Sequence, residues 1–191
     1  MNMDLSIVVP VYNEEKVIDL FYQELKELLD TTSYSYEIIF INDGSKDDTL
    51  SRLTSIHQQD PRTVIINFRK NFGQTAAIAA GFDYARGDAI LTLDADMQND
   101  PKDIPALLKE LKTYDVVCGW RYARQDPFFT KKIPSFFANA VISWVTGVKI
   151  HDYGCGIKAF KKDIAKEIEF YGDMHRFIPA LAHWHGAEIG E

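Results

Sequence analysis

Two aspartates, Asp94 and Asp96, close a run with the character of a buried strand, Asp88 to Leu93. Residues two apart on a strand point to the same side, so both carboxylates can face one point at the carboxyl end of a sheet. Open α/β folds bind their ligands at that end. Paired hard oxygen ligands suit Mg²⁺ or Mn²⁺ that completes its shell with phosphate and water. The pair predicts a metal site for a phosphorylated ligand, although Asp-x-Asp also occurs in solvated loops and helix caps.

Polar clusters follow two earlier strands as well, over 10–15 and 42–45. A parallel sheet places such strand ends along one rim, so the three clusters predict a single binding mouth. The first cluster has no glycine, which counts against a dinucleotide fingerprint and against a phosphate-binding loop. Tyr12 could stack on a base, and Asp43 could accept hydrogen bonds from a base or ribose. Taken alone, Asp43 followed by Gly44 fits an ordinary turn at least as well.

The elements that must position these residues alternate along the chain. Short β-branched runs predict strands at Leu5–Val11, Tyr36–Asn42, Thr63–Phe68, Asp88–Leu93 and Asp115–Gly119. Helical periodicity and composition predict helices over 17–29, 50–56, 73–86 and 103–112. The expected fold class is therefore α/β, with a mostly parallel central sheet and helices on both faces. After Gly119 the alternation stops, and the aromatic, basic and glycine-punctuated sequence predicts a region that builds a site instead of extending the scaffold.

Composition and charge limit the domain organisation and the classes of function that the chain can have. With 191 residues, 46% of them hydrophobic, the chain can form one substantial core, so a single domain over 1–191 is expected. The net charge of -7 argues against a nucleic-acid binder, which would carry a basic stripe. Cys118 and Cys155 show no metal-ligand spacing, which favours a reducing, cytoplasmic setting. The first residues do not have the pattern expected of a signal peptide, and the longest apolar stretch, 133–148, is expected to be too short and too polar to span a bilayer.

Four segments together resemble a known family. They are Ile7-Val-Val-Pro-Val-Tyr-Asn-Glu-Glu15, Asn42-Asp-Gly-Ser-Lys-Asp-Asp-Thr49, Asn71-Phe-Gly-Gln74 and Asp94-Ala-Asp-Met-Gln98. In this order and spacing they resemble the family 2 glycosyltransferases of GT-A fold, a Rossmann-like nucleotide-diphospho-sugar transferase fold. The likeness is greatest to the branch that loads a sugar onto a polyprenyl phosphate, such as dolichol-phosphate mannose synthases and bactoprenol glucosyltransferases. Members usually continue with a further strand, a basic loop and often transmembrane helices, so the resemblance implies a catalytic domain without them.

The resemblance implies a role for particular residues of this chain. The residues implied to bind the nucleotide are Pro10, Tyr12, Glu14, Asp43 and Asp94. Asp94, Asp96 and Gln98 are implied to hold the metal diphosphate through Mg²⁺ or Mn²⁺. Arg121 would lie near the acceptor or the leaving group, and Lys131, Lys132 and Ser135 would meet the acceptor phosphate. His175 and Arg176 are candidate diphosphate contacts, although His175 fits a helix-capping or core histidine equally well.

The implied reaction is a metal-dependent, inverting transfer from a nucleotide-diphosphate sugar to a polyprenyl phosphate. A UDP-glucose-like donor is favoured, and GDP-mannose is the second candidate. Electrostatic stabilisation of the departing diphosphate would be the largest contribution to catalysis. A metal on Asp96 and the positive charge of Arg121 would supply it. A lipid phosphate is already anionic and needs no base. The first alternative is a soluble family 2 enzyme that acts on a saccharide or protein hydroxyl, with Asp152 as the base. The second is a non-catalytic nucleotide-sugar binding module.

The segment 126–137 interleaves aromatic side chains with Lys131 and Lys132. One interpretation is a membrane-surface element that enters the interface and meets anionic head groups. This would make the protein peripheral at the cytoplasmic face of the membrane. Alternatively, the segment is an amphipathic helix that packs on the core, or an exposed partner surface in a homo-oligomer.

Overall fold

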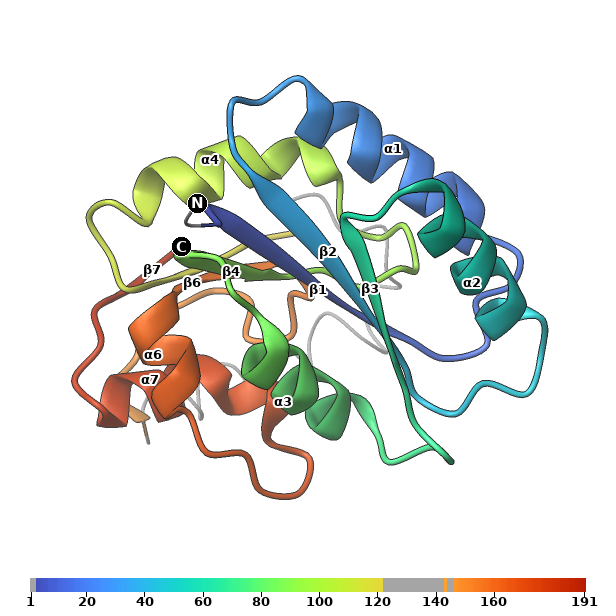
Figure 1. The fold of residues 1–191 in the computed structure, drawn as a ribbon. Coiled ribbons are helices and arrows are strands. Elements are labelled where there is room, and N and C mark those ends of the chain that lie inside the picture. Colours follow the sequence, from blue (N-terminus) through green and yellow to red (C-terminus); the bar gives the residue numbers. More distant parts are fainter. Residues whose placement is uncertain (1–2, 122–142, 144–145) are drawn as a thin grey trace.

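A computed structural model of the protein describes residues 3–121, 143 and 146–191 (Figure 1). Seven strands form one sheet in the order β3-β2-β1-β4-β6-β5-β7. The strands are β1 Leu5–Val11, β2 Tyr36–Asn42, β3 Thr63–Asn67, β4 Ala89–Thr92, β5 Val116–Cys118, β6 Lys158–Lys161 and β7 Ile189–Gly190. The α-helices whose bounds lie within the described residues are α1 Ile18–Asp30, α2 Thr49–Gln59, α3 Gln74–Tyr84, α4 Ile104–Glu110, α6 Lys162–Glu167 and α7 Ile178–Trp184. Short 3₁₀ helices are η1 Pro101–Asp103 and η3 Met174–Phe177.

The sheet is parallel from β3 to β4 and changes direction beyond it. β6 lies antiparallel to both β4 and β5, and β7 is parallel to β5. The α/β fold with a mostly parallel sheet and the five predicted strands are confirmed. The expectation that the chain stops extending the sheet after Gly119 is wrong, because β6 inserts between β4 and β5 and β7 adds an edge. β6 has the sequence Lys-Ala-Phe-Lys and β7 has only two residues, so neither contains the β-branched run that marks the predicted strands.

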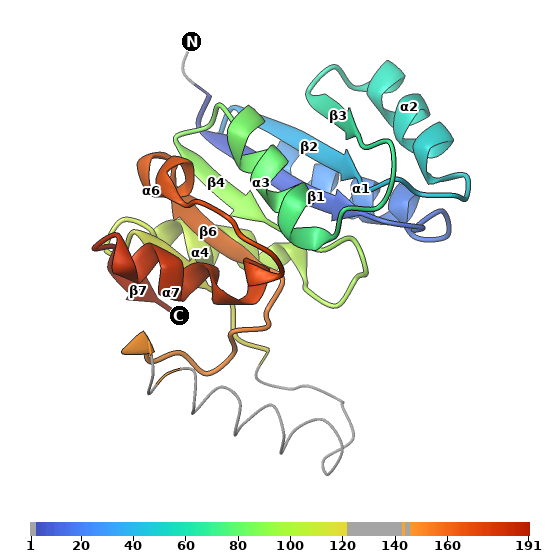
Figure 2. The same cartoon turned by 90° about the horizontal axis from the view of Figure 1, so that it is seen from below.

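Helices cover both faces of the sheet, and the strands between them are buried on both sides. In Figure 1, α1 and α4 lie on one face, and α3, α6 and α7 lie on the other; Figure 2 views this second group from below. Along β1, Ile7 and Val9 pack into the α1 and α4 side, whereas Val8 packs with α3. Successive side chains alternate between two apolar layers, and for this reason the sequences of these strands are continuously hydrophobic.

The register of the parallel strands brings the polar clusters together. Val11 pairs with Asn42 at the ends of β1 and β2, and Val8 pairs with Thr92 at the end of β4. The residues that follow these ends therefore share one rim. The helix α3 begins at the same rim, directly after Gly73, and packs on β1 and β2. Its alanine-rich sequence allows this close packing against the sheet.

Several sequence expectations concern segments away from this rim. Cys118 and Cys155 are both buried free thiols. Within the described parts of the chain, no helix has the length and apolar character needed to cross a bilayer. The segment 126–137, with the candidate acceptor residues Lys131, Lys132 and Ser135, lies outside the described residues.

Candidate active site

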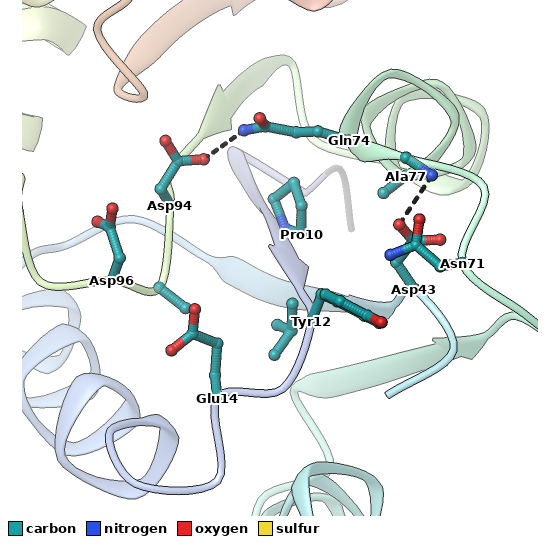
Figure 3. A pocket seen from close by; sticks show the side chains of 12 residues that line it. Pro10, Tyr12, Glu14, Asp43, Asn71, Gln74, Ala77, Asp94 and Asp96 are labelled. Atoms are coloured by element: carbon teal, nitrogen blue, oxygen red, sulfur yellow. Dashed lines mark hydrogen bonds between the residues drawn. The ribbon is translucent and has the colours of Figure 1, made fainter. Parts of the chain in front are cut away.

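A pocket of about 320 Å³ opens at the carboxyl ends of β1, β2 and β4, beside the first turn of α3 (Figure 3). Its lining includes Pro10, Tyr12, Glu14, Asp43, Asp94 and Asp96. These are the residues predicted from the sequence to bind nucleotide or metal, with the exception of Gln98. We call this the acidic pocket. In Figure 3 the carboxylates of Glu14, Asp94 and Asp96 gather on one side, and Tyr12 and Asp43 lie on the other.

Asp43 anchors the loop that leads into α3. It is 4% exposed, and its two carboxylate oxygens accept hydrogen bonds from the backbone amides of Phe72 (2.7 Å) and Gly73 (2.9 Å). The next residue, Gly44, has a φ of +67°, so the turn interpretation of this dipeptide holds as well. A carboxylate offers about four lone-pair positions, so Asp43 keeps acceptor capacity for a ligand while it holds the loop.

The carboxylates on the other side of the pocket repel one another. Burial raises the pKa of Asp94, and the negative charge of Asp96 raises it further. The pKa of Glu14 is raised by burial and then by Asp96, Asp47 and Asp94. A divalent cation would relieve this repulsion. The hard oxygens of Asp94 and Asp96 fit Mg²⁺ or Mn²⁺ that takes its other ligands from phosphate and water. Among the described residues, no group of three or more His, Cys, Asp or Glu side chains is arranged to hold a metal.

Gln98 lies differently from the other predicted metal ligands. Its backbone amide donates to Asp96 Oδ1 (3.0 Å), while its side chain lines a separate pocket beside α1. The preceding residue, Met97, has a φ of +61°, which turns the chain away from the rim. The structure therefore gives Gln98 a part in orienting Asp96 and does not place its side chain in the acidic pocket.

A second pocket of about 160 Å³ lies against the first, and Gln74 and Asp94 line both. The side chains of these two residues are joined by a hydrogen bond from Gln74 Nε2 to Asp94 Oδ1 (2.7 Å), drawn in Figure 3. The second pocket also contains Lys158, His175 and Arg176. We call it the cationic pocket. The sequence predicted His175 and Arg176 as diphosphate contacts, and the structure brings both next to Asp94.

His175 is tied to α3 by hydrogen bonds. Its Nδ1 lies 3.1 Å from Thr75 Oγ1, and its backbone amide donates to the same hydroxyl (3.3 Å). Burial lowers the pKa of His175, and the positive charges of Arg176 and Lys158 lower it further. His175 is thus neutral at neutral pH, and the positive charge of this pocket comes from Lys158 and Arg176.

Sequence reasoning assigned no role to Gln74 or Lys158. Gln74 was visible only as part of a matching segment, because its position at the first turn of α3 depends on the loop that Asp43 holds. Lys158 reaches the site on β6, whose pairing with β4 joins residues more than sixty positions apart in the chain. The local sequence signal for a site residue was therefore weak in both cases.

Arg121 and Asp152 form an ion pair next to these pockets. Arg121 Nε donates to Asp152 Oδ2 (2.8 Å) and Arg121 Nη2 donates to Oδ1 (3.0 Å), which is a bidentate geometry. Asp152 Oδ1 also accepts from the amide of Gly154 (3.1 Å). A carboxylate held in this way is a poor proton acceptor, which disfavours the role of base suggested for Asp152. The charge of Arg121 does reach Asp94, where it lowers the pKa and opposes the effect of burial.

The sequence matches the profile of glycosyl transferase family 2 over residues 6–169. It is 43% identical over 182 residues to a dodecaprenyl-phosphate galacturonate synthase of Rhizobium johnstonii, and the match covers 94% of this chain and 54% of that protein. It is 38% identical over 181 residues to an undecaprenyl-phosphate 4-deoxy-4-formamido-L-arabinose transferase of Pseudomonas fluorescens, covering 94% of this chain and 53% of that protein. The chain thus spans about half the length of these curated relatives.

The fold is similar to that of a solved glucosyl-3-phosphoglycerate synthase from Mycobacterium tuberculosis, in complex with Mn²⁺, UDP and glucosyl-3-phosphoglycerate. The TM-score is 0.76 at 17% sequence identity, and the match covers 98% of this chain and 68% of that one. At this identity the likeness concerns the fold alone. It confirms the GT-A architecture expected from the sequence.

Proposed function

Because the chain belongs to glycosyltransferase family 2, we propose that it moves a sugar from a nucleotide-diphosphate sugar to a polyprenyl phosphate. The two curated relatives described above are named for transfer to dodecaprenyl or undecaprenyl phosphate, which supports this acceptor class. Their names differ in the sugar, so the likeness alone does not select one. A UDP-linked hexose is the proposed donor, with a GDP-linked hexose as the second candidate.

The observation that carries the proposal is the crowding of Glu14, Asp94 and Asp96 at one side of a pocket whose other side holds Tyr12 and Asp43. The nucleoside would lie against Tyr12 and Asp43. The diphosphate would reach Asp94 and Asp96, which would hold Mg²⁺ or Mn²⁺. Such an ion supplies positive charge to the departing diphosphate when it is bound. Gln74 fixes one oxygen of Asp94, so that the carboxylate is oriented before the ligand arrives.

The pairing of Asp152 favours a phosphate acceptor over a hydroxyl acceptor. A hydroxyl must lose its proton to a base, whereas a phosphate oxygen is already anionic. Asp152 is bound by Arg121 through two hydrogen bonds, so it fits a positioning role better than that of a base. With a lipid phosphate as acceptor, the enzyme would work as a peripheral protein at the cytoplasmic face of a membrane. Contacts of Lys131, Lys132 and Ser135 with that phosphate remain part of the proposal.

Calorimetric titration of UDP, GDP and CDP, each with and without Mn²⁺, tests the donor site. We expect one nucleotide to bind only with the metal, and Asp96→Asn to weaken it by at least about tenfold, the effect of losing one charge-assisted contact. Asp96 is exposed, so the variant should fold normally. Asp103→Asn, another exposed aspartate, is the matched control and should bind as the wild type does. The proposal fails if no nucleotide binds under either condition.

A transfer assay then separates an enzyme from a binding module. The wild-type chain would be incubated with the nucleotide sugar, Mn²⁺ and undecaprenyl phosphate in detergent. We expect a glycolipid product that disappears with Asp96→Asn. Nucleotide binding without any glycolipid would favour the non-catalytic alternative, and transfer to saccharide hydroxyls instead would favour the hydroxyl acceptor.

A further inference from the structure

Lys158 is a buried cation in the lining of the cationic pocket. It is 5% exposed, and its ammonium donates to the backbone carbonyl of Cys155. Among the described residues, no carboxylate lies within ion-pair distance of it. Buried lysines are rare without a partner, since removal of an ammonium group from water costs several kcal/mol. Lys158 does line the cationic pocket, so a ligand in that pocket would lie beside it.

The position of the cationic pocket identifies which part of a donor it would hold. A nucleotide sugar has its parts in the order base, ribose, diphosphate and sugar. In the proposed donor site, the base would lie at Tyr12 and Asp43 and the diphosphate at Asp94 and Asp96, which lie on opposite sides of the acidic pocket (Figure 3). The cationic pocket shares Asp94 and therefore comes next in this order. The transferred sugar is the part that would enter it.

The charge of the pocket identifies the kind of sugar. Lys158 and Arg176 both line it, and Arg176 makes no ion pair with any residue that the structure describes. Asp94 is the carboxylate that lines the same pocket, and the charge of Lys158 already lowers its pKa. The proposed metal would take up the charge of Asp94, so a neutral hexose would leave the two cations without a full counter-charge. On the basis of the donor site proposed above, we propose that the cationic pocket binds a sugar that carries a carboxylate, a uronic acid, with Lys158 and Arg176 as its carboxylate-binding residues. An acidic hexose differs from the glucose-like sugar expected from the sequence, and the experiment below compares a charged with a neutral sugar.

The test compares donors that differ only at one group. Where UDP is the nucleotide that binds, the pair is UDP-galacturonate and UDP-galactose; where it is GDP, the pair is GDP-mannuronate and GDP-mannose. Dissociation constants are measured with Mn²⁺ on the wild type and on Lys158→Met, which keeps the length of the side chain and removes its charge. We expect the wild type to bind the uronate at least about tenfold tighter than the neutral sugar, as is typical of one charge-assisted contact. Lys158→Met should reduce this preference to within about twofold without a change in binding of the bare nucleotide.

Two further variants serve as a control and as a second test of the charge preference. Lys112→Met removes an exposed lysine outside both pockets and should retain the full preference. Arg176→Gln changes an exposed residue, so it should fold even where Lys158→Met does not, and it should lower the uronate preference about threefold through loss of a partly solvated contact.

The outcomes separate this inference from the proposed function. Equal binding of the two sugars by the wild type, with normal binding of the nucleotide, would overturn the inference and leave the donor site intact. Weaker binding of the bare nucleotide by Lys158→Met would assign Lys158 to the diphosphate and overturn the inference as well. The same holds if inorganic phosphate competes equally with both sugars and Lys158→Met abolishes that competition, because the pocket would then belong to the acceptor phosphate. Failure of every nucleotide to bind would overturn the proposed function together with the inference.

Discussion

The two ends of the sheet hold buried charge in different ways. Near the amino ends of β1 and β2, Glu37 is 1% exposed and fully engaged. Its oxygens accept from the Ser6 hydroxyl (2.7 Å), the Arg86 amide (2.9 Å) and Arg86 Nε (2.9 Å). At the carboxyl ends, Asp94 is half-buried beside another carboxylate, Asp96, and Lys158 is buried without an ion-pair partner among the described residues.

The pKa values follow this difference. Burial alone would raise the pKa of Glu37, but hydrogen bonds from Arg86 and Ser6 outweigh it and hold the pKa below its usual range. Burial also raises the pKa of Asp94, and there Asp96 adds to the rise. Ionised Glu37 therefore stabilises the fold, whereas ionised Asp94 costs stability. Charges that weaken a fold and lie at a ligand-binding rim are typical of functional sites.

The largest effect is expected from Gly156→Ala, which would disturb the wall between the pockets. A Cβ at this position would lie 2.0 Å from Asp94 Oδ2 and 2.5 Å from its Cγ, so the carboxylate must move. In enzymes, a misplacement of about 1 Å can lower the reaction rate about 100-fold, and we expect a loss of similar size in affinity when a metal-binding carboxylate moves. We expect Mn²⁺-dependent nucleotide binding, measured by calorimetry, to weaken by about that factor.

Gly154→Ala is the matched control for this change. Its Cβ would lie 3.3 Å from the end of the flexible Arg121 side chain and 3.5 Å from Asp152 Oδ1, so binding should change no more than a few fold. Equal losses in the two variants would mean that the position of Asp94 is not what controls binding.

The next effect concerns the opposite end of the sheet and should leave both pockets intact. Glu37→Gln removes the charge that Arg86 binds, and we expect a loss of about 2 kcal/mol in the free energy of unfolding, the scale of hydrogen bonds to charged groups. Because the folded-state pKa of Glu37 is lowered, its stabilisation is fully present above the usual value of 4.5 and is lost as the pH falls through the folded-state value. Urea unfolding at pH 7 and pH 4 should therefore give a smaller difference between variant and wild type at the lower pH. Nucleotide affinity that changes more than about twofold would show that the two ends are coupled.

The same contrast explains how far the sequence alone could go. Asp43, Asp94 and Asp96 were predictable because they follow apolar runs with the composition of buried strands, and parallel pairing brings the ends of such strands to one rim. Lys158 was not predictable as a site residue, because β6 has the sequence Lys-Ala-Phe-Lys without β-branched residues and returns antiparallel to β4 from far along the chain. The placement of Gln98 depended on the positive φ of Met97, which has no local sequence signal.

At the rim itself, a substitution should increase the stability of the fold, by less than Glu37→Gln decreases it. Asp94→Asn removes a charge that burial and Asp96 both disfavour, while its amide oxygen can still accept from Gln74. We expect the metal-free protein to gain about 1 kcal/mol, which raises the Tm by about 2–4 °C for a chain of this size. Differential scanning calorimetry without Mn²⁺ at pH 7 measures it, and nucleotide binding should be lost in the same variant. A lower Tm would mean that the carboxylate contributes more through its hydrogen bond than its repulsion costs.

The smallest effect is expected where the cationic pocket is joined to α3. Thr75→Val removes the hydroxyl that contacts both Nδ1 and the amide of His175. Arg176 is the next residue, so a less constrained η3 should hold its guanidinium less firmly over the pocket. We expect the preference for a uronate donor to fall about two- to threefold, within the range of one neutral hydrogen bond, in the same calorimetric comparison. Thr113→Val, at an exposed position outside both pockets, should leave it unchanged. An unchanged preference in Thr75→Val would show that Thr75 does not position Arg176, and the charge discrimination would then rest on Lys158, which the strand β6 holds independently of η3.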